Sequence, residues 1–168
     1  GAILLEAEVT VFCSGMDLKE DASESPATLH AELFSINATL TKPMVAAVQG
    51  AALAGGLGLA LTAHIVVAAS DARFGLTETR IGLWPYTIFP VLASAVGRRK
   101  ATELALSARI FDAETALRLG LVEHIVAPPE LAAKSLELAS ELAAGSAEAA
   151  ANGLRYARET EGMRLAKV

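Results

Sequence analysis

Residues 44–69, MVAAVQGAALAGGLGLALTAHIVVAA, contain no Asp, Glu, Lys or Arg. Glycines divide this stretch into shorter apolar runs. Two of these runs, MVAAV and HIVVAA, contain no glycine. Apolar runs of four to eight residues bounded by glycine are typical of strands in a parallel sheet that is covered on both faces. The stretch therefore predicts two buried strands, with a turn at residues 49–56 and a helix beginning near Leu57 between them.

The same stretch raises two other interpretations, and its composition argues against both. The uncharged run is long enough to cross a bilayer, but Pro43 precedes it, glycines and Gln49 interrupt it, and no basic cluster flanks it. A dinucleotide-binding loop would need a third glycine where Leu61 stands, and an acidic residue after the next strand. We therefore expect no membrane span and no dinucleotide site.

Composition sets the broad class of the protein. The 168 residues are 53% hydrophobic and 20% charged, which predicts one folded domain and excludes a disordered chain. A net charge of −5 argues against nucleic acid as a partner. Cys13 is the single cysteine, so no internal disulfide can form and we expect a cytoplasmic location. The chain begins inside a predicted strand and without signal-peptide features, so we expect a preceding N-terminal segment.

The rest of the chain alternates strands and helices first and ends in helices. Asp112 is placed to cap a helix that Gly120 ends, and LVEHIV follows as a last strand. The other predicted elements are a strand at 2–5, an extended connection at 71–85, and helices at 26–40, 86–96, 98–107, 129–143 and 146–159. We therefore predict an α/β core over residues 1–127 and a C-terminal helical, oligomerisation segment over 128–168.

Two adjacent glycines stand at the start of the helix predicted within the opening stretch. A backbone N–H can approach a ligand closely where no side chain intervenes, and a helix N-terminus favours negative charge. Gly55 and Gly56 offer both features, and the loop CSGMD offers a further N–H after Gly15. Two such donors together would form an oxyanion hole. Spacing alone leaves open the alternative that these glycines only allow tight turns.

Three motifs in order, FCSGMDLKE, KPMVAAVQGAALAGGLGLALTAHIVVAASDARFGLTE and GLVEHIV, resemble the enoyl-CoA hydratase/isomerase (crotonase) superfamily. The resemblance extends over residues 1–145. It implies a crotonase-like ββα spiral with a C-terminal helical region, acting on an acyl-CoA thioester. It implies no separate cofactor and no metal, because coenzyme A is part of the substrate. It also implies a homotrimer or dimer of trimers in which the C-terminal helices pack between subunits. The family's N-terminal R-P-x-x-x-N-A motif is absent from this sequence.

The resemblance also implies roles for individual residues. The backbone N–H groups of Met16 and Gly55 would hold the thioester oxygen, and Glu78 would be the catalytic carboxylate. Gly58 stands where hydratases of the family have a first glutamate. The implied substrate-binding residues are Asp17, Leu18, Lys19, Gly56, Trp84 and Tyr86. Packing roles remain open for Trp84 and Tyr86, and His64 is interpreted as a strand residue that takes no part in catalysis.

The single retained glutamate affects the expected reaction. Adding water to a double bond needs one group to activate water and one to protonate carbon, whereas shifting the double bond needs only one proton carrier. The sequence therefore favours isomerisation slightly, although family members with this pattern are also called hydratases. The alternative is a non-catalytic acyl-CoA-binding homologue. Retention of Glu78 favours an enzyme, since a buried unpaired carboxylate is costly. Gly58→Glu is expected to raise hydration, with Tyr86 as the main obstacle.

Overall fold

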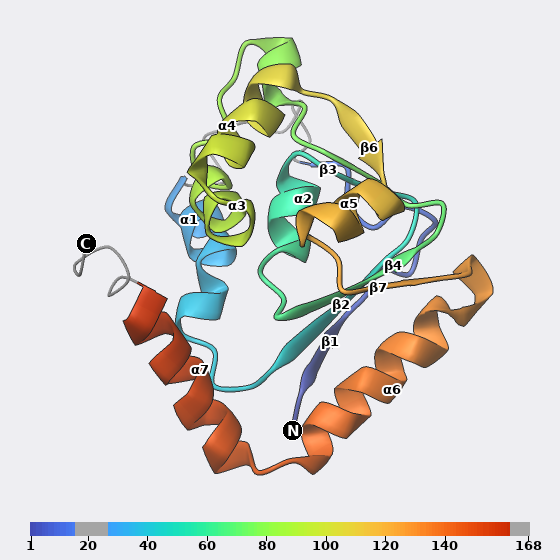
Figure 1. Ribbon diagram of the computed structural model, residues 1–168, viewed down its shortest axis with the longest axis vertical. Coiled ribbons are helices and arrows are strands. Elements are labelled where there is room, and N and C mark those ends of the chain that lie inside the picture. Colours follow the sequence, from blue (N-terminus) through green and yellow to red (C-terminus); the bar gives the residue numbers. More distant parts are fainter. Residues whose placement is uncertain (16–26, 162–168) are drawn as a thin grey trace.

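The computed structural model describes residues 1–15 and 27–161, and Figure 1 shows their arrangement. Four strands form a parallel sheet in the order β1 (Ile3–Leu5), β2 (Met44–Val48), β4 (Ile65–Ala69) and β7 (His124–Val126). The two strands predicted from the opening stretch are its central pair, with Val45 opposite Ile65 and Val48 opposite Ala68. The predicted parallel sheet is confirmed.

A second sheet of three strands lies beside the first. It has the order β3 (Ala51–Leu53), β5 (Arg73–Gly75) and β6 (Ile110–Asp112). Strands β3 and β5 are parallel, whereas β5 and β6 are antiparallel. The turn predicted at 49–56 is therefore wrong in part, because residues 51–53 are a strand. Each strand has three residues, which is too short for a repeating pattern to identify it in the sequence.

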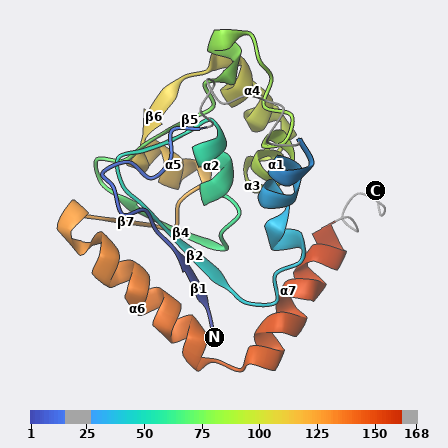
Figure 2. The same ribbon diagram turned by 180° about the vertical axis from the view of Figure 1, so that it is seen from behind.

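The large sheet is covered on both faces (Figures 1 and 2). On one face lie α2 (Gly55–Ala60) and α5 (Ala113–Leu119), and on the other lies α6 (Leu131–Ala144). Away from that sheet lie α1 (Ala27–Phe34), α3 (Phe89–Val96) and α4 (Arg98–Ser107). The described residues also form three short 3₁₀ helices, η1 (Ile36–Ala38), η2 (Glu78–Ile81) and η3 (Pro128–Glu130). None of the described helices is both long and apolar enough to cross a membrane.

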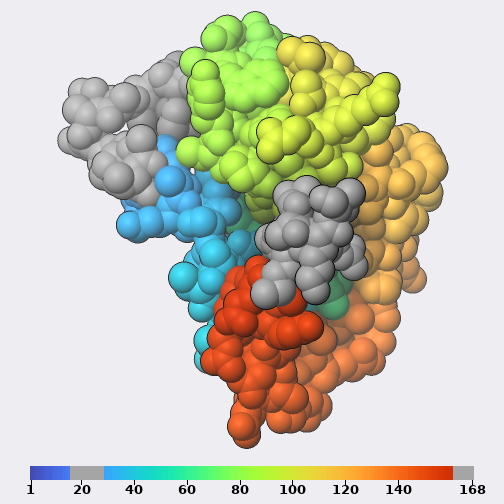
Figure 3. Space-filling view, turned by 60° about the vertical axis from the view of Figure 1, so that its left-hand side comes forward, coloured from blue at the N-terminus to red at the C-terminus, as the bar shows by residue number. Residues whose placement is uncertain are grey.

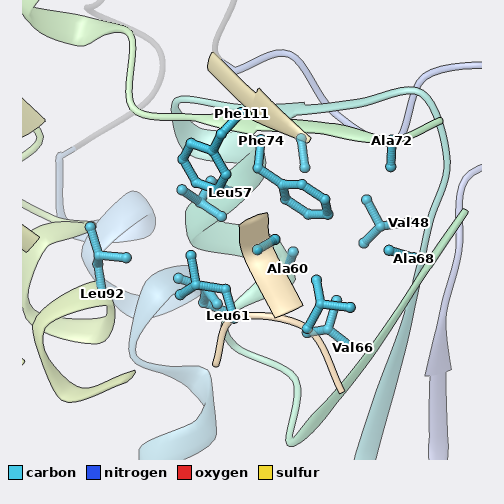
Figure 4. Close-up of a cluster of buried hydrophobic side chains, with 14 of the residues drawn as sticks. Val48, Leu57, Ala60, Leu61, Val66, Ala68, Ala72, Phe74, Leu92 and Phe111 are labelled. Carbon is cyan, nitrogen blue, oxygen red and sulfur yellow. The ribbon is translucent and has the colours of Figure 1, made fainter. Parts of the chain in front are cut away.

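Side chains alternate between the two faces of β2 and β4 because successive residues of a strand point in opposite directions. Val48, Val66 and Ala68 belong to the larger core, which includes Leu57 and Ala60 of α2 (Figure 4). The intervening residues of the same strands, Val45, Ala47, Val67 and Ala69, belong to a second core with α6. The uncharged composition of residues 44–69 is therefore explained by burial on both faces of the sheet.

The last described element is α7 (Ala147–Glu161), which lies at an angle to α6 and forms the lower projection in Figure 3. Its one long-range hydrogen-bonded contact among the described residues comes from Arg158, whose Nη1 donates to the carbonyl oxygens of Leu40 at 2.8 Å and Asn37 at 3.3 Å. The two helices predicted at the C-terminus are thus confirmed, with boundaries shifted by one to two residues.

Local sequence signals set several other helix boundaries. The N–H of Thr115 donates to Asp112 Oδ1 at 2.8 Å, and Gly120 has a φ of 75°, so the predicted start and end of α5 are confirmed. The helix predicted over 26–40 ends at Phe34, and only the short η1 follows. The helix predicted from residue 86 begins at Phe89, after a turn in which Ile88 N–H donates to the Pro85 carbonyl.

Candidate active site

Three chain segments leave the small sheet at the same edge. Cys13 forms a parallel bridge to Ala52, where the Leu53 N–H donates to the Cys13 carbonyl at 3.0 Å. The Ala54 N–H donates to the Gly75 carbonyl at 2.9 Å, so the ends of β3 and β5 also lie side by side. Ligands of α/β proteins bind at the carboxyl ends of parallel strands. This edge therefore joins the loop after Cys13, the start of α2 and the segment leading to Glu78.

Gly55 is the first residue of α2 and provides a backbone donor at this edge. A helix has no internal acceptors for its first N–H groups. Within residues 1–15 and 27–161 the Gly55 N–H donates to no acceptor. The preceding residue, Ala54, has a φ of 50°, a value that non-glycine residues rarely adopt. This conformation turns the chain sharply from β3 into α2, and a role of the Gly55 N–H in binding a ligand stays a prediction.

The two neighbouring glycines are explained by close backbone contacts. Gly15 has a φ of 107°, and a β-carbon there would lie 3.7 Å from the Gly55 nitrogen, so the first loop lies against the start of α2. Gly56 is buried, and a β-carbon there would collide with the Cys13 carbonyl oxygen. Gly56 thus has a packing role in this fold, and its contact with substrate stays a prediction.

Glu78 is the carboxylate of this region. It begins η2, three residues after β5 ends at Gly75. Its Oε2 is buried and has no hydrogen-bond partner among the described residues. Burial raises the pKa of the Glu78 carboxyl, and hydrogen bonds from the backbone at Glu78 and Thr77 oppose this shift to a smaller extent. Thr79 fixes η2 by donating from Oγ1 to the Ala105 carbonyl at 3.0 Å. A carboxylate held in this way can accept and return a proton.

Four of the other predicted site residues lie outside the described residues; these are Met16, Asp17, Leu18 and Lys19. Trp84 is half-buried and packs on Phe89, with ring centroids 5.7 Å apart. Tyr86 is 79% exposed, so it is not packed within this chain. Contact of either aromatic residue with substrate stays a prediction.

Gly58 lies beneath two apolar side chains that sequence analysis did not identify. A β-carbon at position 58 would lie 2.8 Å from Ile88 Cγ1 and 2.9 Å from Phe34 Cε1. These contacts depend on how α1 and the start of α3 pack against α2, for which the sequence carries no local signal. A glutamate at position 58 would therefore meet this pair, and the expectation that Tyr86 is an obstacle stays a prediction.

His64 takes part in structural hydrogen bonds. Its Nδ1 accepts from the Met44 N–H at 3.0 Å, and its own backbone N–H donates to the Met44 carbonyl at 2.9 Å. Burial first, and the charge of Arg158 second, lower the pKa of the imidazole. His64 therefore joins the start of β2 to the start of β4. Within the part of the chain that the structure describes, no three His, Cys, Asp or Glu residues gather as a metal site would require.

The fold and this sheet edge define a class of protein with many solved representatives. Crystal structures of enoyl-CoA hydratases from Shewanella pealeana and Bacillus anthracis superpose with TM-scores of 0.86 and 0.82, each at 30% identity. Each comparison covers 95% of this chain and 63% of the solved one. The chain thus has the crotonase fold. A model of the enoyl-CoA hydratase/isomerase family matches residues 1–167, and the chain belongs to that family.

Curated relatives agree with this assignment. Human mitochondrial methylglutaconyl-CoA hydratase is 39% identical over 132 residues, which are 74% of this chain and 39% of the human protein. Enoyl-CoA hydratase EchA19 of Mycobacterium tuberculosis is 36% identical over 164 residues, which are 90% of this chain and 61% of that protein. The chain therefore spans about two fifths to three fifths of the length of these relatives.

Proposed function

We propose that the protein is an enzyme of enoyl-CoA hydratase/isomerase chemistry, which acts on an acyl-CoA thioester through an enolate. The observation that supports this most is the buried Glu78 Oε2, which has no partner among the described residues and belongs to the segment that follows β5 beside the start of α2. A buried carboxylate oxygen without a partner is costly, and a role in stabilising the fold alone would not explain why Oε2 is left in this state. The names of the relatives support an enoyl-CoA thioester as the substrate.

In the proposed reaction the Gly55 N–H donates to the thioester oxygen as negative charge develops there. One such donor contributes on the order of 10²–10³ to the rate. A second donor, the N–H of Met16, is implied by the family resemblance. Glu78 removes a proton from C2, and the electrons of that C–H bond form the C1=C2 bond of the enolate. Because burial raises the pKa of Glu78, the protonated form can also return the proton to carbon.

A single carboxylate is sufficient when the proton is only moved along the chain. In a 3-enoyl thioester the enolate is conjugated with the C3=C4 bond. Return of the proton from Glu78 to C4 leaves a double bond between C2 and C3, with no atoms gained or lost. We therefore prefer isomerisation to hydration as the activity of this site.

The proposal is tested by turnover of a panel of 2-enoyl-CoA and 3-enoyl-CoA thioesters by the full-length protein. The absorbance of the conjugated thioester rises on isomerisation and falls on hydration, so one instrument follows both. We expect turnover of at least one class. Tight acyl-CoA binding with no turnover of any member would contradict the proposal and favour the non-catalytic homologue.

A further inference from the structure

The face of α2 that starts at Gly55 carries an apolar wall. Positions 55 and 58 are nearly one helical turn apart and share a face. The Phe34 ring reaches both of them, since a β-carbon at Gly55 would lie 3.5 Å from Cζ and one at Gly58 would lie 2.9 Å from Cε1. Ile88 fills the space next to Gly58: a β-carbon at Gly58 would lie 2.8 Å from Ile88 Cγ1 and 3.0 Å from Ile88 Cγ2.

Both wall residues are fixed by other elements. Ile88 is 4% exposed, its N–H donates to the Pro85 carbonyl, and its carbonyl accepts from Leu92 at the start of α3. Phe34 is the last residue of α1, and the next residue, Ser35, donates from Oγ to the Ala31 carbonyl at 2.7 Å, which holds the end of that helix. Both side chains pack against the larger core.

The Phe34 and Ile88 side chains offer no polar atom to a water molecule. A buried water needs two to four polar partners. Phe34, Ile88 and Gly58 have no polar side-chain atom, and Gly58 is itself buried. A carboxylate in this space would lose its hydration without gaining a partner, which is costly. Among the described residues, the side chains nearest to position 58 are therefore apolar and include no acid.

We propose that Phe34 and Ile88 are specificity-determining residues that restrict the site to proton transfer by Glu78 and exclude the addition of water. This inference rests on the proposed function and deepens it, because it assigns the choice between isomerisation and hydration to two named residues. In this reaction a C–H bond breaks at C2 and one forms at C4, and the proton travels on Glu78. Water is neither consumed nor released.

The test compares hydration of a 2-enoyl-CoA with isomerisation of a 3-enoyl-CoA in the full-length protein. We expect the wild-type protein to isomerise at least about 10²-fold faster than it hydrates, the size of one missing acid–base group. Gly58→Glu alone gains no hydration, because its β-carbon meets Ile88 and Phe34. Gly58→Glu combined with Ile88→Ala opens the space and raises the hydration-to-isomerisation ratio at least about 10-fold over either single variant.

Leu104→Ala is the matched control, since Leu104 is 1% exposed in α4 and is not among the side chains nearest to Gly58. It should lower stability and leave the ratio unchanged. Wild-type hydration as fast as isomerisation would overturn the inference and leave the proposed function standing. So would a folded double variant that binds acyl-CoA with an unchanged ratio. Absence of both reactions in the wild-type protein would instead overturn the proposed function, and this inference with it.

Discussion

Burial gives Glu78 both a catalytic use and a cost in stability. Its Oε2 lies out of solvent without a partner in the described structure, so the neutral acid is favoured and the pKa is raised. The sequence pointed to Glu78 and Gly55 as candidate site residues, because the segments around them resemble those of the enoyl-CoA hydratase/isomerase family. Phe34 and Ile88 were not identified, since only the packing of α1 and α3 against α2 makes them neighbours of Gly58.

The raised pKa of Glu78 predicts the pH dependence of turnover and of stability. The base acts only when ionised, so kcat/KM should rise with pH. The midpoint of this rise should lie at a higher pH than for a glutamate with an ordinary pKa. The folded state also binds this proton more tightly than the unfolded state, so stability falls as pH rises from the ordinary pKa through the raised one. Glu78→Gln should remove that loss and raise the Tm at neutral pH.

Two measurements check these effects. A pH profile of kcat/KM for the wild-type protein gives the first, and thermal unfolding of the wild-type protein and Glu78→Gln at acidic and neutral pH gives the second. An acidic limb at the position of an exposed glutamate, together with equal Tm values at neutral pH, would show that the carboxylate is not desolvated.

At the scale of elements, the length of a strand decided whether the sequence could predict it. Strands β2 and β4 have five residues each and were identified by their apolar runs, whereas β3, β5 and β6 have three each. The capped helix α5 was placed correctly because Asp112 and Gly120 act locally. The small sheet depends on contacts between distant residues, and these bring together the strand ends that lead to Gly55 and to Glu78.

Helix α6 contains a polar side chain that its packing does not satisfy. Ser135 is fully buried, and its Oγ has no partner in the described structure. An unsatisfied buried hydroxyl costs about 1–3 kcal/mol, so Ser135→Ala should stabilise the protein by about 1 kcal/mol. Chemical denaturation measures the change. The matched control is Ser140→Ala, whose exposed Oγ donates to the Leu136 carbonyl at 2.7 Å, and it should give no gain. A loss of stability in Ser135→Ala would contradict the claim that the buried Ser135 hydroxyl destabilises the folded protein.

For the whole molecule, the division at about residue 127 stays a prediction. The last strand ends at Val126, and α6 then packs on the large sheet as part of the second core. Beyond it lies α7, whose Arg158 donates the hydrogen bonds described above to Asn37 and Leu40. Tyr156 on the same helix is 69% exposed. This arrangement leaves the surface of α7 available for contacts between subunits.

We therefore predict that the full-length protein is a homotrimer or a dimer of trimers with the C-terminal helices α6 and α7 at the interface. Sedimentation at micromolar protein concentration measures the assembly. Tyr156→Glu, which puts a charge on the exposed face of α7, should shift it toward smaller species. Glu114→Gln on α5, an exposed position outside residues 128–168, is the control and should leave it unchanged. A monomer in the wild-type sample would contradict this prediction.

The central claim is that Glu78 carries the proton, and Glu78→Gln tests it most directly. The amide keeps the shape of the side chain and cannot accept the proton from C2. We predict a loss of kcat of about 10²-fold or more for 3-enoyl-CoA, with acyl-CoA binding nearly unchanged and with Glu141→Gln as active as the wild-type protein. A Glu78→Gln protein that retained more than about a tenth of the wild-type kcat would contradict the role of Glu78, since acid–base groups typically contribute 10²–10⁴.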